Sequence, residues 1–190
     1  MKFKISKTKL NMMFLLFFYL SVYANDAEKF EAVKQHHIKE LASLLNISVQ
    51  TTPDTPSKEH HFFKKNEDTQ LGAFLFRPRD IQENHTIFDV YNGGNKRIAW
   101  GHYYEMPSIK SAQLCLLEDL SCTSMPLFLV AKRMQVIKGI GDLCVSDKGD
   151  VVSFLSFTRN GSFVKLKAVD NSSQLADVAK TIDGRLGTVQ

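Results

Sequence analysis

Three stretches of the chain repeat apolar residues every three or four positions, which is the spacing of one face of a helix. They span residues 26–46, residues from Ser108 to about 120, and residues 172–186. The apolar positions are Phe30, Val33, Ile38, Leu41, Leu44 and Leu45; Ile109, Ala112, Leu116, Leu117 and Leu120; and Leu175, Val178, Ala179, Ile182 and Leu186. The pattern predicts three amphipathic helices that dock on a common core.

Between these stretches the pattern indicates strands. Residues 72–77 predict a strand closed by Pro78, and residues 87–91 and 96–105 flank Asn92-Gly93-Gly94-Asn95, a composition that reverses a strand. Residues 127–137 favour a strand, with a buried helical segment as the alternative that periodicity does not decide. The polar segment near 48–70 contains two prolines and shows no period, so we expect a flexible loop there.

The sharpest local signal lies in residues 151–170, where Asn160-Gly161 separates two apolar runs. These two residue types tolerate positive φ, so a two-residue type I′ hairpin is favoured. Counting outward pairs Phe157 with Val164 and Leu155 with Leu166 on a core face, and Ser156 with Lys165 and Phe154 with Lys167 on a face expected to be at least half solvated.

This order of elements favours an α+β fold, with an N-terminal, an inserted and a C-terminal helix on one face of a twisted antiparallel sheet. A doubly wound fold is disfavoured because strands and helices do not alternate strictly. Residues 25–190 are enough for one domain.

The first 24 residues have the composition of a cleavable signal peptide. A Lys-rich start is followed by the apolar run 12–20, and Val22-Tyr23-Ala24 places small residues at the cut. The run is too short to span a bilayer, so we expect a secreted or periplasmic protein with no stable membrane anchor after cleavage.

The leader also changes the charge balance. The whole chain has 24 Lys and Arg against 20 Asp and Glu, but Lys2, Lys4, Lys7 and Lys9 precede residue 25 without any acid, which leaves 20 of each. A neutral mature domain gives no support for a nucleic-acid partner.

Cys115, Cys122 and Cys144 are three thiols in a chain predicted to be exported, where oxidation is expected and one thiol is left over. On an unbroken helix Cys115 and Cys122 would lie too far apart to bridge. We therefore predict a Cys122–Cys144 disulfide, with Cys115 as a small buried helix residue.

Catalytic motifs are missing from the sequence: there is no Gly-x-Ser-x-Gly, no Ser-x-x-Lys and no complete phosphate loop around Gly139-Ile140-Gly141. The six histidines lack zinc-binding spacing, so no metal or other cofactor is expected, although a metal site assembled from separate segments stays open. If the protein is a hydrolase, the groups to inspect first are His102, Glu105, Asp142 and Arg159.

Residues 136–186 carry Val-Ile-Lys-Gly-Ile-Gly-Asp, the 151–170 hairpin and Leu-Ala-Asp-Val-Ala-Lys-Thr-Ile-Asp-Gly-Arg-Leu. This run resembles the C-terminal part of uncharacterised exported bacterial domains, in which a Gly-x-Gly-Asp turn precedes a hairpin and a helix. The resemblance implies a secreted or periplasmic domain without enzymatic activity, and it assigns no functional residue.

We therefore expect an exported binding or inhibitor-type module that recognises another secreted or envelope protein. In the strand 96–105, Ile98, Trp100, His102 and Tyr104 alternate with Ala99, Gly101 and Tyr103. Trp100, Tyr103 and Tyr104 form the candidate binding surface, because exposed Trp and Tyr supply large contact areas. The alternatives are a hydrolase with a site assembled from distant segments, and a small-ligand carrier with an apolar cavity between sheet and helices.

Overall fold

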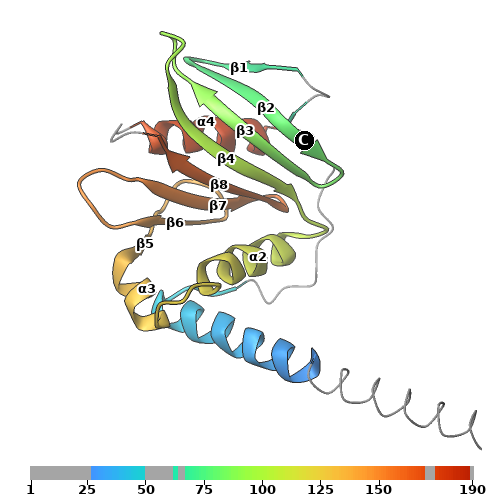
Figure 1. Cartoon of the computed structure of the whole chain (residues 1–190), viewed down its shortest axis with the longest axis vertical. Helices are drawn as coiled ribbons and strands as arrows, with labels where there is room; N and C mark the ends of the chain where they lie inside the picture. Colours follow the sequence, from blue (N-terminus) through green and yellow to red (C-terminus); the bar gives the residue numbers. More distant parts are fainter. Residues whose placement is uncertain (1–26, 50–61, 64–66, 170–173, 189–190) are drawn as a thin grey trace, which may run out of the picture.

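The computed structural model describes residues 27–49, 62–63, 67–169 and 174–188. Within these ranges eight antiparallel strands form one sheet, in the order β1-β2-β3-β4-β8-β7-β6-β5 (Figure 1). The strands are β1 (Thr69–Leu71), β2 (Phe74–Gln82), β3 (His85–Tyr91), β4 (Arg97–Glu105), β5 (Met134–Val136), β6 (Leu143–Asp147), β7 (Phe154–Arg159) and β8 (Ser162–Ala168). The helices are residues 27–44, α2 (Ile109–Ser121), α3 (Leu127–Arg133) and α4 (Leu175–Gly187).

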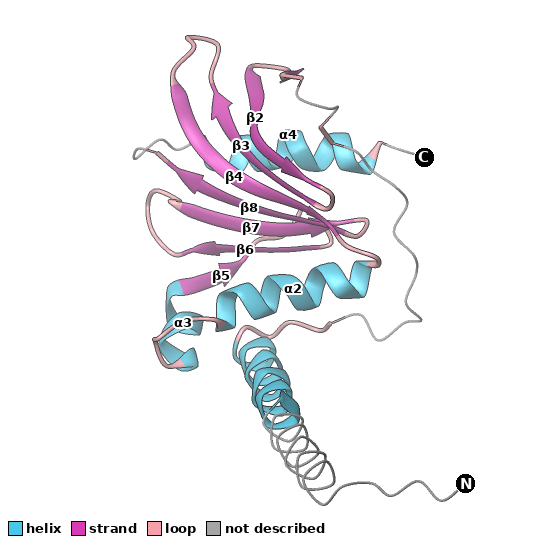
Figure 2. Ribbon diagram, turned by 45° about the vertical axis from the view of Figure 1, so that its right-hand side comes forward, coloured by secondary structure: helices cyan, strands magenta, loops and turns pink. Residues whose placement is uncertain are grey.

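The helices cover the sheet from both sides, as Figure 2 shows. α4 packs on one face, against side chains such as Leu155 and Phe157. α2 packs on the opposite face, and the helix 27–44 packs on α2 through Leu41. The predicted α+β class with N-terminal, inserted and C-terminal helices is confirmed, but placing all the helices on one face was wrong.

The final hairpin forms as the turn residues predict. Asn160 has a φ of 50° and Gly161 a φ of 85°, and Phe157 pairs with Val164 as expected. The opposite face of this hairpin is solvated only in part, because Ser156 and Thr158 are fully buried on the α2 side whereas Lys167 is exposed. The polar residues of β7 therefore did not indicate that α2 packs on this face of the hairpin.

Two strand boundaries differ from the pattern. β2 continues past Pro78 to Gln82, with a bulge between Pro78 and Asp80. β1 pairs only with residues 74–76, so among the described residues no strand pairs with Pro78 on that side, and its missing N–H costs no ladder bond. Residues 127–137 were favoured as a strand, but they split into α3 and the short β5.

The N-terminal helix is less buried than its apolar pattern suggests. Ile38, Leu41 and Ala42 are buried, whereas Phe30 is 73% and Val33 is 53% exposed. The predicted leader 1–24 lies outside the described residues.

The predicted flexible loop 48–70 is in part ordered core. Phe62 and Phe63 are buried against Phe76, Phe88 and Tyr103, and Thr69–Leu71 forms β1. Residues 50–61 and 64–66 of this segment lie outside the described residues. Phe62 and Phe63 stand in an otherwise polar segment, and two adjacent phenylalanines indicate that the chain returns to the core there.

β4 lies in the middle of the sheet. A bulge near its start changes which of its side chains share a face. Val90 pairs with Ala99 and Tyr91 with Arg97, so Ile98 is an unpaired bulge residue. Ile98 therefore turns into the α4-side core instead of sharing the face of Trp100, as the alternation had predicted. From Ala99 to Glu105 the alternation holds.

Candidate functional site

The side of β2, β3 and β4 that faces away from α4 carries none of the described helices (Figures 1 and 2). α2 packs below β7 and β8 on this side, and the uncovered strands continue beyond it. We call this surface the Trp100 face. It consists of Arg79, His85, Asp89, Arg97, Trp100, His102, Tyr104 and Lys167.

Trp100 lies in the middle of this face and is partly exposed. On one side it is paired with Lys167 of β8, and on the other with Asp89 of β3. The Lys167 ammonium lies 5.5 Å from the centre of the indole ring, within the range of a cation–π contact. Lys167 is exposed and forms no ion pair with any residue that the structure describes, so its charge is available to a partner.

Asp89 is buried between two arginines. Its carboxylate lies 3.3 Å from Nε of Arg79 and 2.7 Å from Nη2 of Arg97. One carboxylate balances one of the two guanidinium groups, so this cluster keeps one net positive charge. Trp100 is thus flanked by positive charge on two sides, from Lys167 of β8 and from the cluster that Arg79 of β2 and Arg97 of β4 form around Asp89 of β3, although residues 25–190 contain equal numbers of basic and acidic side chains.

Two histidines meet beside Trp100. Nε2 of His85 lies 2.8 Å from Nδ1 of His102, and the Tyr104 hydroxyl lies 3.4 Å from the same Nδ1. Tyr104 stacks on His85 with ring centres 4.3 Å apart. Burial lowers the pKa of His85, and burial, followed by the neighbouring His85 and Lys165, lowers the pKa of His102. Both imidazoles are therefore held neutral at pH 7.

Tyr103 points to the opposite side of the sheet. It is 3% exposed and packs against Phe62 and Phe63, and its hydroxyl lies 3.2 Å from Glu105 and 3.3 Å from Ser162. Burial raises the pKa of its phenol well above the usual value. Of the predicted surface Trp100, Tyr103 and Tyr104, the structure brings Trp100 and Tyr104 together and removes Tyr103, because successive side chains of a strand alternate.

The sequence pattern missed Lys167, Asp89 and the two arginines of this face. The Asn92–Asn95 turn indicates that β3 pairs with β4, but the bulge at Ile98 shifts the register by one residue, and only this shift places Asp89 opposite Trp100 and His85 opposite Tyr104. The pairing of β4 with β8 joins residues far apart along the chain, and no local pattern indicates it.

The four groups considered for a hydrolase lie on two sides of the sheet. His102 is on the Trp100 face, whereas Arg159 lies on the α4 side and binds Asp142 and Asp183. Asp142 also accepts a hydrogen bond from the backbone N–H of Asn160, and so it stabilises the hairpin turn. These carboxylates and Arg159 hold structure together, and His102 is not joined to them in one cleft.

All three cysteines are free thiols in the structure, so the predicted Cys122–Cys144 disulfide is not formed. Cys122 caps the end of α2 and is exposed, whereas Cys144 is buried in β6 on the α4 side. The sheet lies between them. Burial raises the pKa of Cys115 to about 11 and that of Cys144 to about 12, which keeps both thiols protonated and unreactive.

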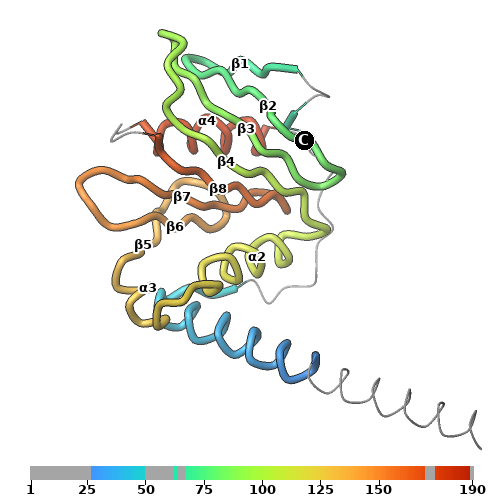
Figure 3. Tube along the Cα trace, viewed as in Figure 1, coloured from blue at the N-terminus to red at the C-terminus, as the bar shows by residue number. Residues whose placement is uncertain are grey.

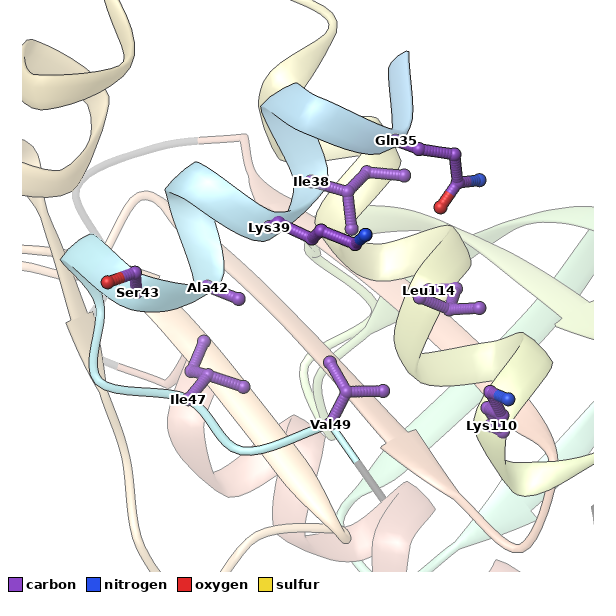
Figure 4. Close-up of a pocket in the computed structure, with 9 residues that line it drawn as sticks. All are labelled: Gln35, Ile38, Lys39, Ala42, Ser43, Ile47, Val49, Lys110 and Leu114. Atoms are coloured by element: carbon purple, nitrogen blue, oxygen red, sulfur yellow. The ribbon is translucent and has the colours of Figure 1, made fainter. Parts of the chain in front are cut away.

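An apolar groove of about 630 Å³ lies between the helix 27–44 and α2 (Figure 4). Its walls are Ile38, Ala42, Ile47, Val49 and Leu114, with Gln35, Lys39, Ser43 and Lys110 around them. The groove lies between two helices and not between sheet and helices, where the small-ligand carrier hypothesis placed its cavity. The residues that line this groove include no Asp, Glu or His beside the two lysines.

Among the described residues no group of three or more His, Cys, Asp or Glu side chains is arranged to hold a metal ion. No helix in the described ranges has both the length and the apolar character needed to cross a membrane. The folded path of the chain through these layers is shown in Figure 3.

Comparison with known proteins returned no match to a protein-family model, to a curated protein or to a solved structure. The resemblance of residues 136–186 to exported bacterial domains therefore stays a prediction.

Proposed function

We propose that the protein is an exported binding module that recognises another secreted or envelope protein through the Trp100 face. The observation that carries this proposal is the position of Trp100, which is partly exposed between Lys167 of β8 and the Arg79–Asp89–Arg97 cluster, whose residues come from β2, β3 and β4. Trp and Arg are the residue types most enriched among those that dominate binding energy at protein interfaces.

The charges of the face specify the chemistry of the partner. Lys167 and the unbalanced guanidinium of the Asp89 cluster favour acidic side chains, while the indole ring favours an apolar or aromatic group between them. We therefore propose a partner surface with an apolar residue flanked by Asp or Glu. Because these positive charges are local on a neutral domain, they favour a specific partner over general binding to polyanions.

The proposal is tested by comparing captured proteins from the secreted and envelope fractions of the source organism. Trp100→Ala removes the central contact, and Lys167→Glu reverses one flanking charge. Phe128→Ala and Lys180→Glu are matched controls, because Phe128 is 59% exposed on α3 and Lys180 is exposed on α4, both away from the Trp100 face.

We expect one captured protein with an acidic surface, whose affinity falls by at least about tenfold in Trp100→Ala. Lys167→Glu should mainly slow association, and this effect should shrink at high salt. The controls should bind like the unmodified protein. If the Trp100 and Phe128 variants capture the same proteins with equal affinity, the proposal is wrong.

A further inference from the structure

We propose that His85 and His102 form a binding site for a divalent transition-metal ion such as Cu²⁺ or Zn²⁺ on the Trp100 face. This inference is independent of the protein partner proposed above, since it concerns a different ligand and different atoms. It rests on the convergence of two imidazole nitrogens from separate strands.

The distance between the two nitrogens is close to what a metal requires. Nε2 of His85 and Nδ1 of His102 are 2.8 Å apart, so the nitrogens of the two rings already face each other. With Zn–N bonds of about 2.0–2.1 Å, two tetrahedral ligands lie roughly 3.3 Å apart. An opening of about 0.5 Å, well within the rotation of a side chain, would exchange the shared hydrogen bond for a shared metal ion.

The surrounding packing holds both rings in place. The two imidazole planes are tilted by only 1°, and Tyr104 stacks on His85 at 4.3 Å. Tyr104 is itself stacked on Phe163, with ring centres 5.3 Å apart. Ligands that are already ordered lose little conformational entropy when they bind an ion.

Binding to the neutral form of both imidazoles needs no net release of protons. One N–H proton moves from the shared position to the other nitrogen of the same ring, through solvent, and both nitrogens then bind the ion through their lone pairs. No electron is transferred. Asp80 near His85 and Asp119 near His102 offset the positive charges of Lys165 and Lys167.

Two imidazoles leave the other coordination positions to water and to the Tyr104 hydroxyl, which lies 3.4 Å from Nδ1 of His102. A site with so few protein ligands suits Cu²⁺ and Zn²⁺, because imidazole is a good ligand for both. Affinity should follow the general order for divalent ions, with Cu²⁺ bound more tightly than Zn²⁺.

The direct test is NMR of the histidine ring nitrogens in the unmodified protein during titration with Zn²⁺. We expect saturable shifts of Nε2 of His85 and Nδ1 of His102 at one ion per chain. His36 and His37 are exposed neighbours on the N-terminal helix and serve as internal controls, together with His60 and His61. Shifts confined to these four histidines, or no saturable shift, would overturn the proposal.

Variants give a second readout. His85→Gln and His102→Gln should each weaken Zn²⁺ binding by at least about tenfold, measured by competition with a chromophoric chelator. A variant with His36, His37, His60 and His61 all replaced by Ala should keep the affinity of the unmodified protein. If the two Gln variants bind Zn²⁺ as tightly as this fourfold variant, the site is not the His85–His102 pair. The titration of the unmodified protein decides the question even where a variant fails to fold.

Discussion

The guanidinium group of Arg159 binds the carboxylate of Asp183 through two nitrogens, with Nε at 2.5 Å and Nη2 at 2.8 Å. Arg159 ends β7 and Asp183 lies in α4, so this pair fastens the last hairpin to the helix that covers it. Asp183 is 7% exposed, and its hydrogen bond raises the pKa of Arg159 further above its usual value.

Removing this carboxylate should destabilise the fold. Asp183→Ala leaves Arg159 without its main partner, and we expect a loss of about 2 kcal/mol, less than for a fully buried pair because Arg159 is partly exposed. Urea unfolding measures the loss. Asp177→Ala, at an exposed position of the same helix, should change the free energy of unfolding by about 0.5 kcal/mol or less. Equal losses of unfolding free energy in the two variants would show that the Arg159–Asp183 pair does not stabilise the fold.

Gly101 should not tolerate a side chain. A Cβ atom there would lie 2.6 Å from the carbonyl oxygen of Lys165 and 2.7 Å from Cζ of Phe88. We expect Gly101→Ala to cost about 1–3 kcal/mol in free energy of unfolding. Gly184→Ala is the matched control, since its Cβ meets open space in α4 and a helix gains up to about 1 kcal/mol from this change. A neutral Gly101→Ala would contradict the close packing of β4 on β8.

The thiols should react in a fixed order. Cys122 is exposed, whereas burial raises the pKa of Cys115 and Cys144. We expect one fast-reacting thiol in the folded protein with a colorimetric disulfide reagent, and none in Cys122→Ser. In denaturant without reductant, all three thiols should react. Detection of only one thiol under those conditions would mean that a disulfide forms after all.

Stability should fall as the pH is lowered because of His85 and His102. Their pKa values are lowered in the folded protein, so the unfolded chain takes up protons first as the pH drops below about 6.5. The contribution of the pair is present above that pH and is lost as the pH falls through the folded pKa values. The urea midpoint of the unmodified protein should therefore drop more between about pH 7 and pH 5 than that of the His85→Gln/His102→Gln variant. Equal drops would exclude the pair as the cause.

Local sequence patterns predicted the turns and helix starts, because these depend on residues that are close together in the chain. The turn at Asn160-Gly161 requires positive φ, so it set the register from Phe157–Val164 outward, and the helix starting at Ser108 follows from a side chain that accepts the N–H of Ser111. Long-range placement was not predictable in the same way. The burial of Ser156 depends on α2 folding over the second face of the hairpin, which no pattern in β7 records.

The candidate site was half predictable for the same reason. Alternation in β4 brought Trp100, His102 and Tyr104 to one face, but it could not show that none of the described helices covers this face or that Tyr103 contacts Phe62. The charges around Trp100 come from β2, β3, β8 and the start of β4, and their arrangement depends on strand pairings across the sheet. The disulfide prediction failed because spacing along the chain does not show that the sheet separates Cys122 from Cys144.

The central claim, that the Trp100 face contacts a partner, is tested most directly by photo-crosslinking. The photoreactive residue p-benzoylphenylalanine is placed at position 167 beside Trp100, or at position 180 on α4 as the control. We predict that position 167 crosslinks to one exported protein, at a site next to Asp or Glu residues, and that position 180 does not. Equal crosslinking from both positions, or a partner that is reached only from position 180, would contradict the claim.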